Sequence, residues 1–556
     1  MQTSTSKYKL HFLFGIISLV YLITRLIIFK GFNGTDDLHY AMLAARMVKG
    51  TYSPFVQGDI FSGRVLLIAW QALIYHIAGI SVFTTQVTTL IAVLLSCYIT
   101  VFYLLRASTT ELVCIAAALF YFNPVLTGAS KGILPDIYVV LAGVSAVVLW
   151  SKAQQQTSAK KNILYGFYIG LLLAAGAFFK ETILVFFLLI VCLSFIYRTR
   201  QSAITNLAML GTLLLSGLLI AAWYYYYTGN IFFRFVQVAD STYYNPCSYN
   251  DLPASYIIAR LTYQPWRDFT GFGFYPVILA AALIIYNLFL YKPFSIFKNP
   301  FVLCFFILLI TGLYFPFSLK GYQPLCGDVR HFLFLLPLAV CAAAPYIAAN
   351  IENSKTIKWA FICAVMFAIC VITTTDKWQW MMWCLFVVYF ILVKLLAGKT
   401  SAVAKALALA AVLWMCMPYP LFYGNSNWFN NMKQLNKELT GNYYYFPDHD
   451  NMMHWKLLHQ FNDSMHCYDL DADPFKIFSI YYEKMDTIEF HPGWFLVNTQ
   501  YIARSAGFLH SIDSLEQKNY FTRQINTGDM RAMYLQQPGQ LEQVKKLAEE
   551  DIRVEK

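Results

Sequence analysis

Charged residues are scarce in this 556-residue chain. Asp, Glu, Lys and Arg make up 13% of it, whereas soluble globular proteins carry roughly 25%. Hydrophobic residues make up 58%, and a soluble fold has too little interior to bury that much apolar surface. The composition therefore excludes an ordinary soluble domain and predicts a protein whose apolar surface faces a lipid bilayer.

Acidic residues are especially few over residues 1–421, which hold 12 Asp and Glu against 28 Lys and Arg, a net charge of +16. The remainder holds 18 acidic and 13 basic residues, a net charge of −5. The basic residues stand at the ends of apolar segments, where positive charge orients membrane helices. We therefore expect no nucleic-acid partner. We predict a membrane module over 1–422 and a separate extracytoplasmic domain over 423–556.

The first apolar run lacks a signal-peptide cleavage site, and apolar stretches of spanning length recur after it. We predict thirteen spans, at residues 10–29, 83–105, 112–129, 135–150, 162–179, 182–197, 203–223, 273–290, 300–317, 331–350, 357–374, 378–396 and 402–422. The basic loops share one side with Lys7 and Lys9, so that side and the N-terminus are predicted to be cytoplasmic. Residues 64–80 are also apolar, but a crossing there would turn every later basic loop outward. We therefore predict that they form an interfacial segment.

The C-terminal residues alternate short β-rich runs with amphipathic stretches. Strands are predicted at 442–446, 494–498 and 533–536, and helices at 449–461 and 539–550. This alternation indicates a small α/β domain. Cys247 and Cys326 lie in predicted outer regions, and a disulfide between them is left open.

Polar residues gather after the first span, where Asp36 and Asp37 open a short helical pattern that ends at Gly50. We expect Asp36, His39 and Tyr40 on the polar side of a helix at the lipid–water boundary. Acids in a first helical turn also interact favourably with the helix dipole, so a purely structural role is left open. Two adjacent carboxylates are equally suited to a base or a cation site.

Several short motifs follow one another along the chain in an order typical of one family. They are Asp36-Asp37-x-x-Tyr40 followed by Ala44-Ala45-Arg46, then Leu134-Pro135-Asp136, Phe179-Lys180-Glu181, and Arg330-His331-Phe332 running to Pro337. In this order they resemble the protein O-mannosyltransferases and lipid A aminoarabinose transferases, which are membrane glycosyltransferases with the GT-C fold. The chain departs from the family at Ser62-Gly63-Arg64-Val65, where the family often has an acid, a Lys and a Pro.

The resemblance implies a polytopic α-helical GT-C protein that transfers a sugar from a polyprenyl phosphate, with a juxtamembrane catalytic loop over 30–82. It implies catalytic roles for Asp36 and Asp37, with Asp36 as the base. It implies donor-phosphate contacts for Arg64, Lys180 and Arg330, and substrate contacts for Tyr40, Asp136, Glu181 and His331. No cofactor is certain, and a divalent metal on Asp36, Asp37 or Asp136 is left open.

The leading hypothesis is therefore an inverting glycosyltransferase of the outer face of a bacterial inner membrane, with its C-terminal domain in the periplasm. Its acceptor would be a glycolipid, a glycan or a protein, and membrane lipid would be a further partner. Two alternatives remain, namely a transporter or flippase of lipid-linked sugars and a catalytically inactive scaffold of the same fold. Transporter sites usually lie near the bilayer midplane, whereas the charges here cluster at span ends.

Overall fold

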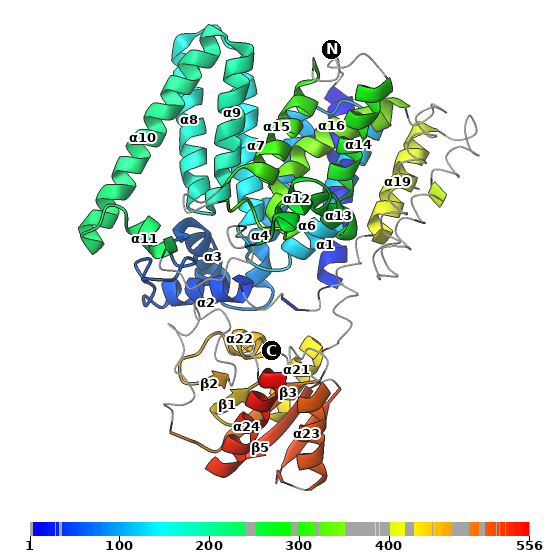
Figure 1. Ribbon diagram of the computed structural model, residues 1–556. Coiled ribbons are helices and arrows are strands. Elements are labelled where there is room, and N and C mark those ends of the chain that lie inside the picture. Colours follow the sequence, from blue (N-terminus) through cyan, green and yellow to red (C-terminus); the bar gives the residue numbers. More distant parts are fainter. Residues whose placement is uncertain are drawn as a thin grey trace.

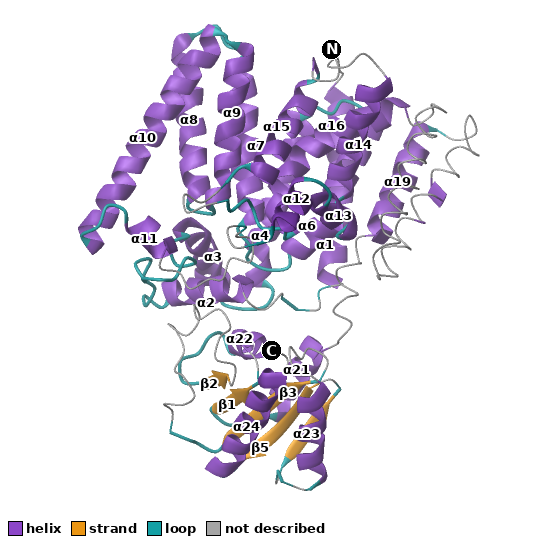
Figure 2. Cartoon of the chain, in the orientation of Figure 1, coloured by secondary structure: helices purple, strands orange, loops and turns teal. Residues whose placement is uncertain are grey.

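The chain forms a helical bundle with a smaller domain containing a β-sheet at one end (Figures 1 and 2). The computed structural model describes residues 4–416 apart from 28, 30, 33–35, 240–248, 250–251, 291–297, 317–321, 351–383, 385–387 and 390–400. It also describes residues 428–554 apart from 448, 470–488, 500–505, 519, 522 and 529. Helices α2 and α3 lie across the end of the bundle that faces the sheet domain (Figure 1).

The bundle is built from helices of very different length. In chain order they are α1 (Ser4–Ile27), α2 (Asp36–Val48), α3 (Val65–Ala78), α4 (Thr84–Tyr98) with its π-helical continuation η1 (Ile99–Leu104), α5 (Thr110–Tyr121), α6 (Pro124–Ala129), α7 (Asp136–Ala153), α8 (Ala159–Ala177), η2 (Glu181–Ile183), α9 (Leu184–Tyr197), α10 (Arg200–Thr228), α11 (Phe233–Ala239), α12 (Ala254–Leu261), α13 (Gln264–Gly271), α14 (Tyr275–Leu290), α15 (Pro300–Tyr314), η4 (Val329–Leu335), α16 (Leu336–Asn350) and α19 (Ala402–Cys416).

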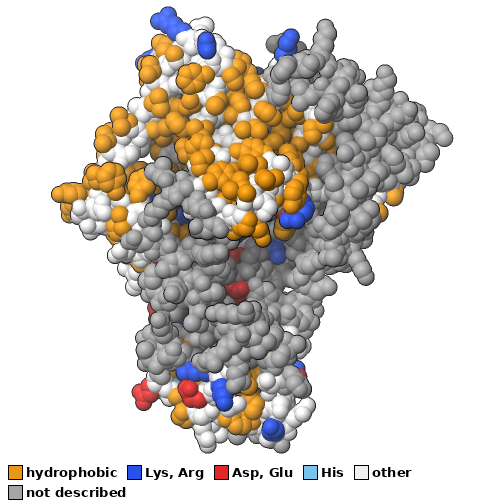
Figure 3. Space-filling model, in the orientation of Figure 1, with side chains coloured by type: hydrophobic (Ala, Val, Ile, Leu, Met, Phe, Trp, Pro, Cys, Tyr) orange, Lys and Arg blue, Asp and Glu red, His pale blue; other side chains and the backbone are white. Residues whose placement is uncertain are grey.

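Five described helical segments are long and apolar enough to cross a membrane, and each lies on a predicted span. They are Tyr8–Ile27, Thr84–Leu104, Asp136–Ala153, Arg200–Thr228 and Val329–Ala349. Hydrophobic side chains dominate the upper part of the face in Figure 3, and basic side chains stand at its upper edge. The predicted spans at 357–374 and 378–396 lie largely outside the described residues, so the number of spans stays a prediction.

The stretch predicted as one span at 112–129 is not one continuous helix, because the chain breaks after α5. The side chain of Asn123 accepts a hydrogen bond from the backbone N–H of Leu126 at 2.8 Å and caps a new helix, α6. Pro124 occupies the first turn of α6, where its missing N–H costs nothing. A cap and a proline at adjacent positions therefore start a second, short helix.

Helix α3 has 14 residues, about 21 Å of helix, which is shorter than the roughly 30 Å hydrocarbon core. It packs along α2 rather than continuing the bundle (Figure 1). Helix α9, which lies on a predicted span, is equally short, so the interfacial position of residues 64–80 stays a prediction. Gly50, with φ of 76°, follows the end of α2 as predicted.

The C-terminal part holds a five-stranded sheet of order β2-β1-β3-β5-β4. The strands are β1 (Tyr443–Phe446), β2 (His466–Asp469), β3 (Gly493–Asn498), β4 (Gln524–Thr527) and β5 (Met530–Leu535), and the helices are α21 (Trp428–Glu438), α22 (His449–Leu458), α23 (Ala506–Gln517) and α24 (Pro538–Val554). Strand β1 pairs in parallel with β2 and β3, whereas β5 is antiparallel to β3 and β4.

The predicted strands match β1, β3 and β5, but β2 and β4 were not predicted. The domain boundary at 422/423 falls among residues that are not described and stays a prediction.

One cysteine expectation is tested only in part. Cys326 is disulfide-bonded, and Cys247 lies outside the described residues. Seven described cysteines are free, among them the buried Cys467 of the sheet domain.

Candidate active site

Most of the predicted site residues meet near α2 and α3, at the end of the bundle that faces the sheet domain (Figure 1). Lys180 and Glu181 come from the hairpin between α8 and η2, and Arg330 and His331 come from η4. Asp36 is the first residue of α2, and its carboxylate receives a hydrogen bond from the Arg330 guanidinium at 2.9 Å. Arg330 also contacts Asp328 at 2.7 Å, and the Asp328 side chain caps η4. The Asp36 side chain is 18% exposed, so this carboxylate is held in place yet reachable.

The adjacent acid, Asp37, lies in a different environment. Its side chain is fully buried and lies against Gly132, where a Cβ atom would overlap the Asp37 carboxylate. Burial and the charge of Arg25 lower the pKa of the nearby Lys131 ammonium to about 8, and Asp37 offsets part of this shift. The structure therefore separates the two acids predicted to be catalytic, and Asp37 contacts the chain before α7 instead of facing Arg330.

A buried ion pair joins α7 to the hairpin between α8 and η2. Lys180 Nζ lies 2.6 Å from an Asp136 carboxylate oxygen and 2.8 Å from His331 Nδ1. His331 Nδ1 lies 3.3 Å from the same oxygen. Burial lowers the pKa of the Lys180 ammonium, and the Asp136 charge acts in the opposite direction. Because Arg330 and His331 are consecutive, η4 joins this pair to the Asp36 contact.

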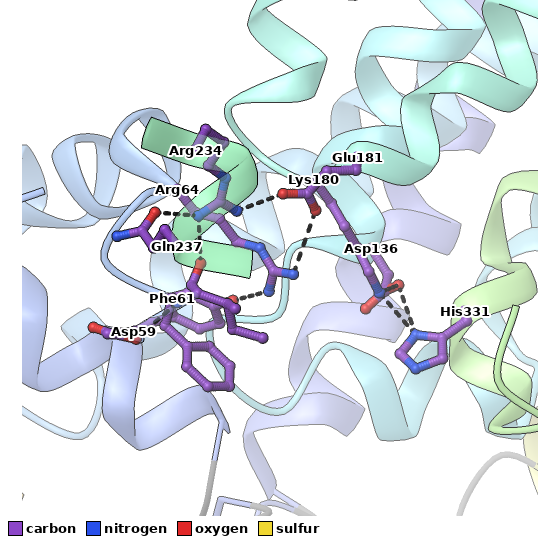
Figure 4. Close-up of polar contacts among 11 residues, drawn as sticks. Asp59, Phe61, Arg64, Asp136, Lys180, Glu181, Arg234, Gln237 and His331 are labelled. Carbon is purple, nitrogen blue, oxygen red and sulfur yellow. Dashed lines mark hydrogen bonds and ion pairs between the residues drawn. The ribbon is translucent and has the colours of Figure 1, made fainter. Parts of the chain in front are cut away.

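A second ion-paired group contains two arginines and one acid (Figure 4). Arg64, which precedes α3, lies 3.6 Å from Glu181, and Arg234 of α11 binds the other oxygen of the same carboxylate. Arg64 also donates a hydrogen bond to the Tyr40 hydroxyl. Burial opposes the charge of Arg64, but Tyr40 and Glu181 outweigh it and raise the pKa of the guanidinium above its ordinary value. The group keeps one uncompensated positive charge.

Tyr40 corrects one expectation. It was predicted, with His39, on a polar face, yet both side chains are fully buried. Phe61 packs edge-on against both rings, and α22 of the sheet domain contacts α2 from outside. Burial raises the pKa of the Tyr40 hydroxyl above its ordinary value, and Arg64 offsets part of this shift. Tyr40 therefore orients Arg64, and only Asp36 of the three residues keeps an exposed fraction.

Sequence reasoning missed Arg234 and Gln237, which reach the site from α11. Arg234 donates to the carbonyl of Ile60 at 3.0 Å and to Gln237 at 2.7 Å. Gln237, fully buried, donates to the carbonyl of Val56 at 2.8 Å. A Cβ atom on Gly63 would overlap the Arg234 guanidinium. The available signal was Gly63 itself, because this chain has a glycine where the family often has an acid.

The residues proposed for a metal are engaged by cations or by backbone. Asp36 binds Arg330, Asp136 binds Lys180, and Asp37 accepts a hydrogen bond from the backbone N–H of Leu38. Within the described ranges, no group of three or more His, Cys, Asp and Glu side chains is placed to hold a metal ion. Metal dependence therefore stays untested.

The fold and this site define the class: a polytopic helical membrane protein with the GT-C fold, whose ion-paired residues gather at one end of the bundle beside a small α/β domain. No protein-family profile matches the chain, and no curated protein sequence matches it.

Solved structures give the particular likeness. The chain resembles apo ArnT, the lipid A aminoarabinose transferase of Cupriavidus metallidurans, with a TM-score of 0.60 at 11% identity over 93% of this chain and 97% of that one. It resembles ArnT bound to undecaprenyl phosphate with a TM-score of 0.56, at the same identity and coverage. The arabinosyltransferase EmbB of Mycobacterium smegmatis matches with a TM-score of 0.41 at 13% identity, over 76% of this chain and 42% of that one.

Proposed function

We propose that the chain is an inverting glycosyltransferase that moves a sugar from a polyprenyl-phosphate donor to a hydroxyl group at the outer face of a membrane. One observation carries this proposal. The accessible carboxylate of Asp36 belongs to the same site as Arg64 and Arg234, which together carry one more positive charge than Glu181 balances. A base and an anion site are the two parts that such a transfer needs.

In the proposed reaction, the acceptor oxygen attacks the anomeric carbon of the sugar while Asp36 takes the hydroxyl proton. The bond between the anomeric carbon and the phosphate oxygen breaks, and the lipid phosphate leaves with both bonding electrons. Attack opposite the leaving group inverts the anomeric carbon. Arg330, which binds Asp36 at 2.9 Å, orients the carboxylate towards the acceptor.

The charge balance favours the Arg64 group as the donor-phosphate site. Guanidinium groups bind phosphate oxygens in a bidentate manner, and among the described residues Glu181 is the one acid paired with Arg64 and Arg234. Lys180 and Arg330, also predicted to bind phosphate, are already held by Asp136 and Asp36. We assign them to organising the site. ArnT, which shares the fold, has been solved with undecaprenyl phosphate bound, and this supports a polyprenyl-phosphate donor.

The test is donor turnover by the full-length protein in lipid vesicles. With a polyprenyl-phosphate-linked sugar and a pool of acceptors, wild type is expected to release polyprenyl phosphate, and Asp36→Asn to lower the rate by about 10²–10⁴-fold. Glu542→Gln, an exposed acid of α24, is the matched control and should keep wild-type turnover. Full turnover by Asp36→Asn would refute the base assignment. Sugar movement across the bilayer without bond cleavage would favour the flippase alternative. If wild type neither cleaves the donor nor moves it across the bilayer, the inactive scaffold is favoured.

The proposed setting is a bacterial inner membrane, with the site and the sheet domain in the periplasm. The support is the basic charge at the opposite end of the predicted spans together with the likeness to ArnT. Labelling of single cysteines by a membrane-impermeant reagent in whole spheroplasts tests the orientation. An introduced cysteine at exposed Asp463 should react, whereas one at Lys160 should not.

A further inference from the structure

Helix α12 has an inverted pattern of burial. Its apolar side chains Tyr256, Ile258 and Leu261 are exposed by 55%, 59% and 43%, whereas Arg260 is only 1% exposed and is the sole buried residue of the helix. Exposed apolar groups on an outer segment of a membrane protein suit contact with lipid. Arg260 therefore attaches this helix to the rest of the protein.

The Arg260 guanidinium makes its contacts at the ends of two neighbouring elements. Nη2 donates to the carbonyl of Leu325 at 2.7 Å and to that of Leu313 at 3.4 Å. Leu313 belongs to the last turn of α15, whose carbonyls lack helical partners, and Leu325 precedes η4. The guanidinium carbon also lies 5.7 Å from the centre of the Phe332 ring, inside η4.

Arg260 carries its charge at a high cost. No carboxylate of the described residues lies within ion-pair distance of it, and its Nε has no hydrogen-bond partner. Burial lowers the pKa of this guanidinium. A buried cation without an ion pair is destabilising, so a leucine or methionine would be more stable at this position. What distinguishes Arg260 from an apolar residue is its two hydrogen bonds to carbonyl groups and its contact with the Phe332 ring.

The contact to Phe332 lies next in sequence to Arg330 and His331, which organise the proposed site. Phe332 follows Arg330 and His331 directly, so all three side chains belong to the short 3-10 helix η4. The same ring packs edge-on against Phe269 of α13, at 5.2 Å between centroids. The segment 254–271 thus contacts η4 through Phe332, while Asp36 and Asp136 contact it through Arg330 and His331.

We propose that Arg260 is a positioning residue that fixes η4, and with it the Arg330 contact to Asp36, from the outer helix α12. The catalytic consequence depends on the proposed function, but the structural one does not. Loss of Arg260 should loosen η4 and misplace the base, without touching the Arg64 group that binds the donor.

The experiment compares Arg260→Met and Arg260→Lys with Arg267→Gln in full-length protein. Arg267 belongs to α13, is 55% exposed and pairs only with its neighbour Asp268 among the contacts of the described residues. For Arg260→Met we expect faster amide hydrogen exchange over 329–335 and a kcat at least about tenfold lower, with donor KM within about twofold of wild type. Arg260→Lys should recover part of kcat, and Arg267→Gln should match wild type in all three measurements.

The outcomes separate the two proposals. Unchanged exchange over 329–335 in Arg260→Met would overturn the positioning role, as would an equal fall in donor affinity and turnover. If wild type shows no transfer activity while Arg260→Met still exchanges faster over η4, the proposed function fails and the positioning role stands. Should Arg260→Met not fold, Arg260→Lys alone decides, since wild-type exchange and kcat in that variant would contradict the proposal.

Discussion

Two consecutive residues, Lys180 and Glu181, belong to two ion-paired groups that differ in burial and in net charge. Lys180 joins Asp136, whose side chain is only 4% exposed, in a closed pair where one positive charge balances one negative charge. Glu181 is 51% exposed and serves two arginines, Arg64 and Arg234. The hairpin between α8 and η2 thus supplies a neutral, buried group on one side and a cationic, partly open group on the other (Figure 4).

The two groups differ in what their charges do: those of the first stabilise the fold, and those of the second are available to a ligand. A buried, balanced pair contributes little to ligand binding because its charges already satisfy each other, but breaking it leaves a stranded charge. In the second group the shared carboxylate of Glu181 is 51% exposed, so ion pairs to it contribute less to stability, and the surplus positive charge can bind an anion. Substitutions in the first group should therefore lower stability, and substitutions in the second should lower donor affinity.

The largest expected effect is on the closed pair. Lys180→Met leaves the buried Asp136 carboxylate without its ion-pair partner, with only His331 in contact and Arg330 farther away, so we expect a loss of about 3 kcal/mol in unfolding free energy. The measurement is the thermal unfolding midpoint of the protein in detergent. The double variant Lys180→Met with Asp136→Leu removes both charges and should recover much of that loss. A single variant as stable as wild type would show that the pair is not buried as described.

Substitutions in the group of Arg64, Arg234 and Glu181 should lower donor affinity more than the stability of the fold. Arg64→Ala and Arg234→Ala each remove charged hydrogen bonds worth about 1.5–3 kcal/mol, which corresponds to roughly a 10–100-fold weaker affinity for the polyprenyl-phosphate donor. Titration with polyprenyl phosphate measures this change. The unfolding midpoint should move much less than in Lys180→Met. A donor affinity unchanged in both arginine variants would remove the anion site from this group.

Much of this arrangement could be predicted from the sequence. The acids after the first span, followed by Gly50, predicted α2, and the order of the family motifs predicted that Asp36, Lys180 and Arg330 share one site. Partner choice could not be predicted, because Lys180 and Arg330 are both cations and either could pair with Asp136 or Asp36. Arg234 was missed because it follows the 29-residue helix α10, and nothing local indicates that α11 returns to the loop before α3. The burial of Tyr40 depends on tertiary packing against Phe61 and Arg64, which periodicity alone does not report.

A smaller effect is expected from Gly63→Ala. The added Cβ would overlap Arg234 and approach Gln237 within 2.6 Å, so the guanidinium must shift away from Glu181. Since only one of the two arginines moves, donor affinity should fall by less than in Arg234→Ala, about three- to tenfold. Gly211→Ala, where a Cβ meets nothing within 4 Å, is the matched control. Equal donor affinity in Gly63→Ala and Gly211→Ala would mean that Arg234 does not bind the donor.

The smallest effect tests a third ion pair, which is the solvent-exposed reference for the other two. Lys49, after the end of α2, lies 3.0 Å from Asp463 of the sheet domain, and the Asp463 side chain is 88% exposed. Pairs of this kind contribute at most about 1 kcal/mol, so Lys49→Ala should shift the unfolding midpoint slightly and leave donor affinity unchanged. Raising the salt concentration should abolish even this shift, because exposed pairs are screened. A loss of turnover in Lys49→Ala at wild-type stability would mean that the sheet domain orients α2, and with it Asp36, through this contact. The distinction between structural and functional charge would then have to extend beyond the membrane part.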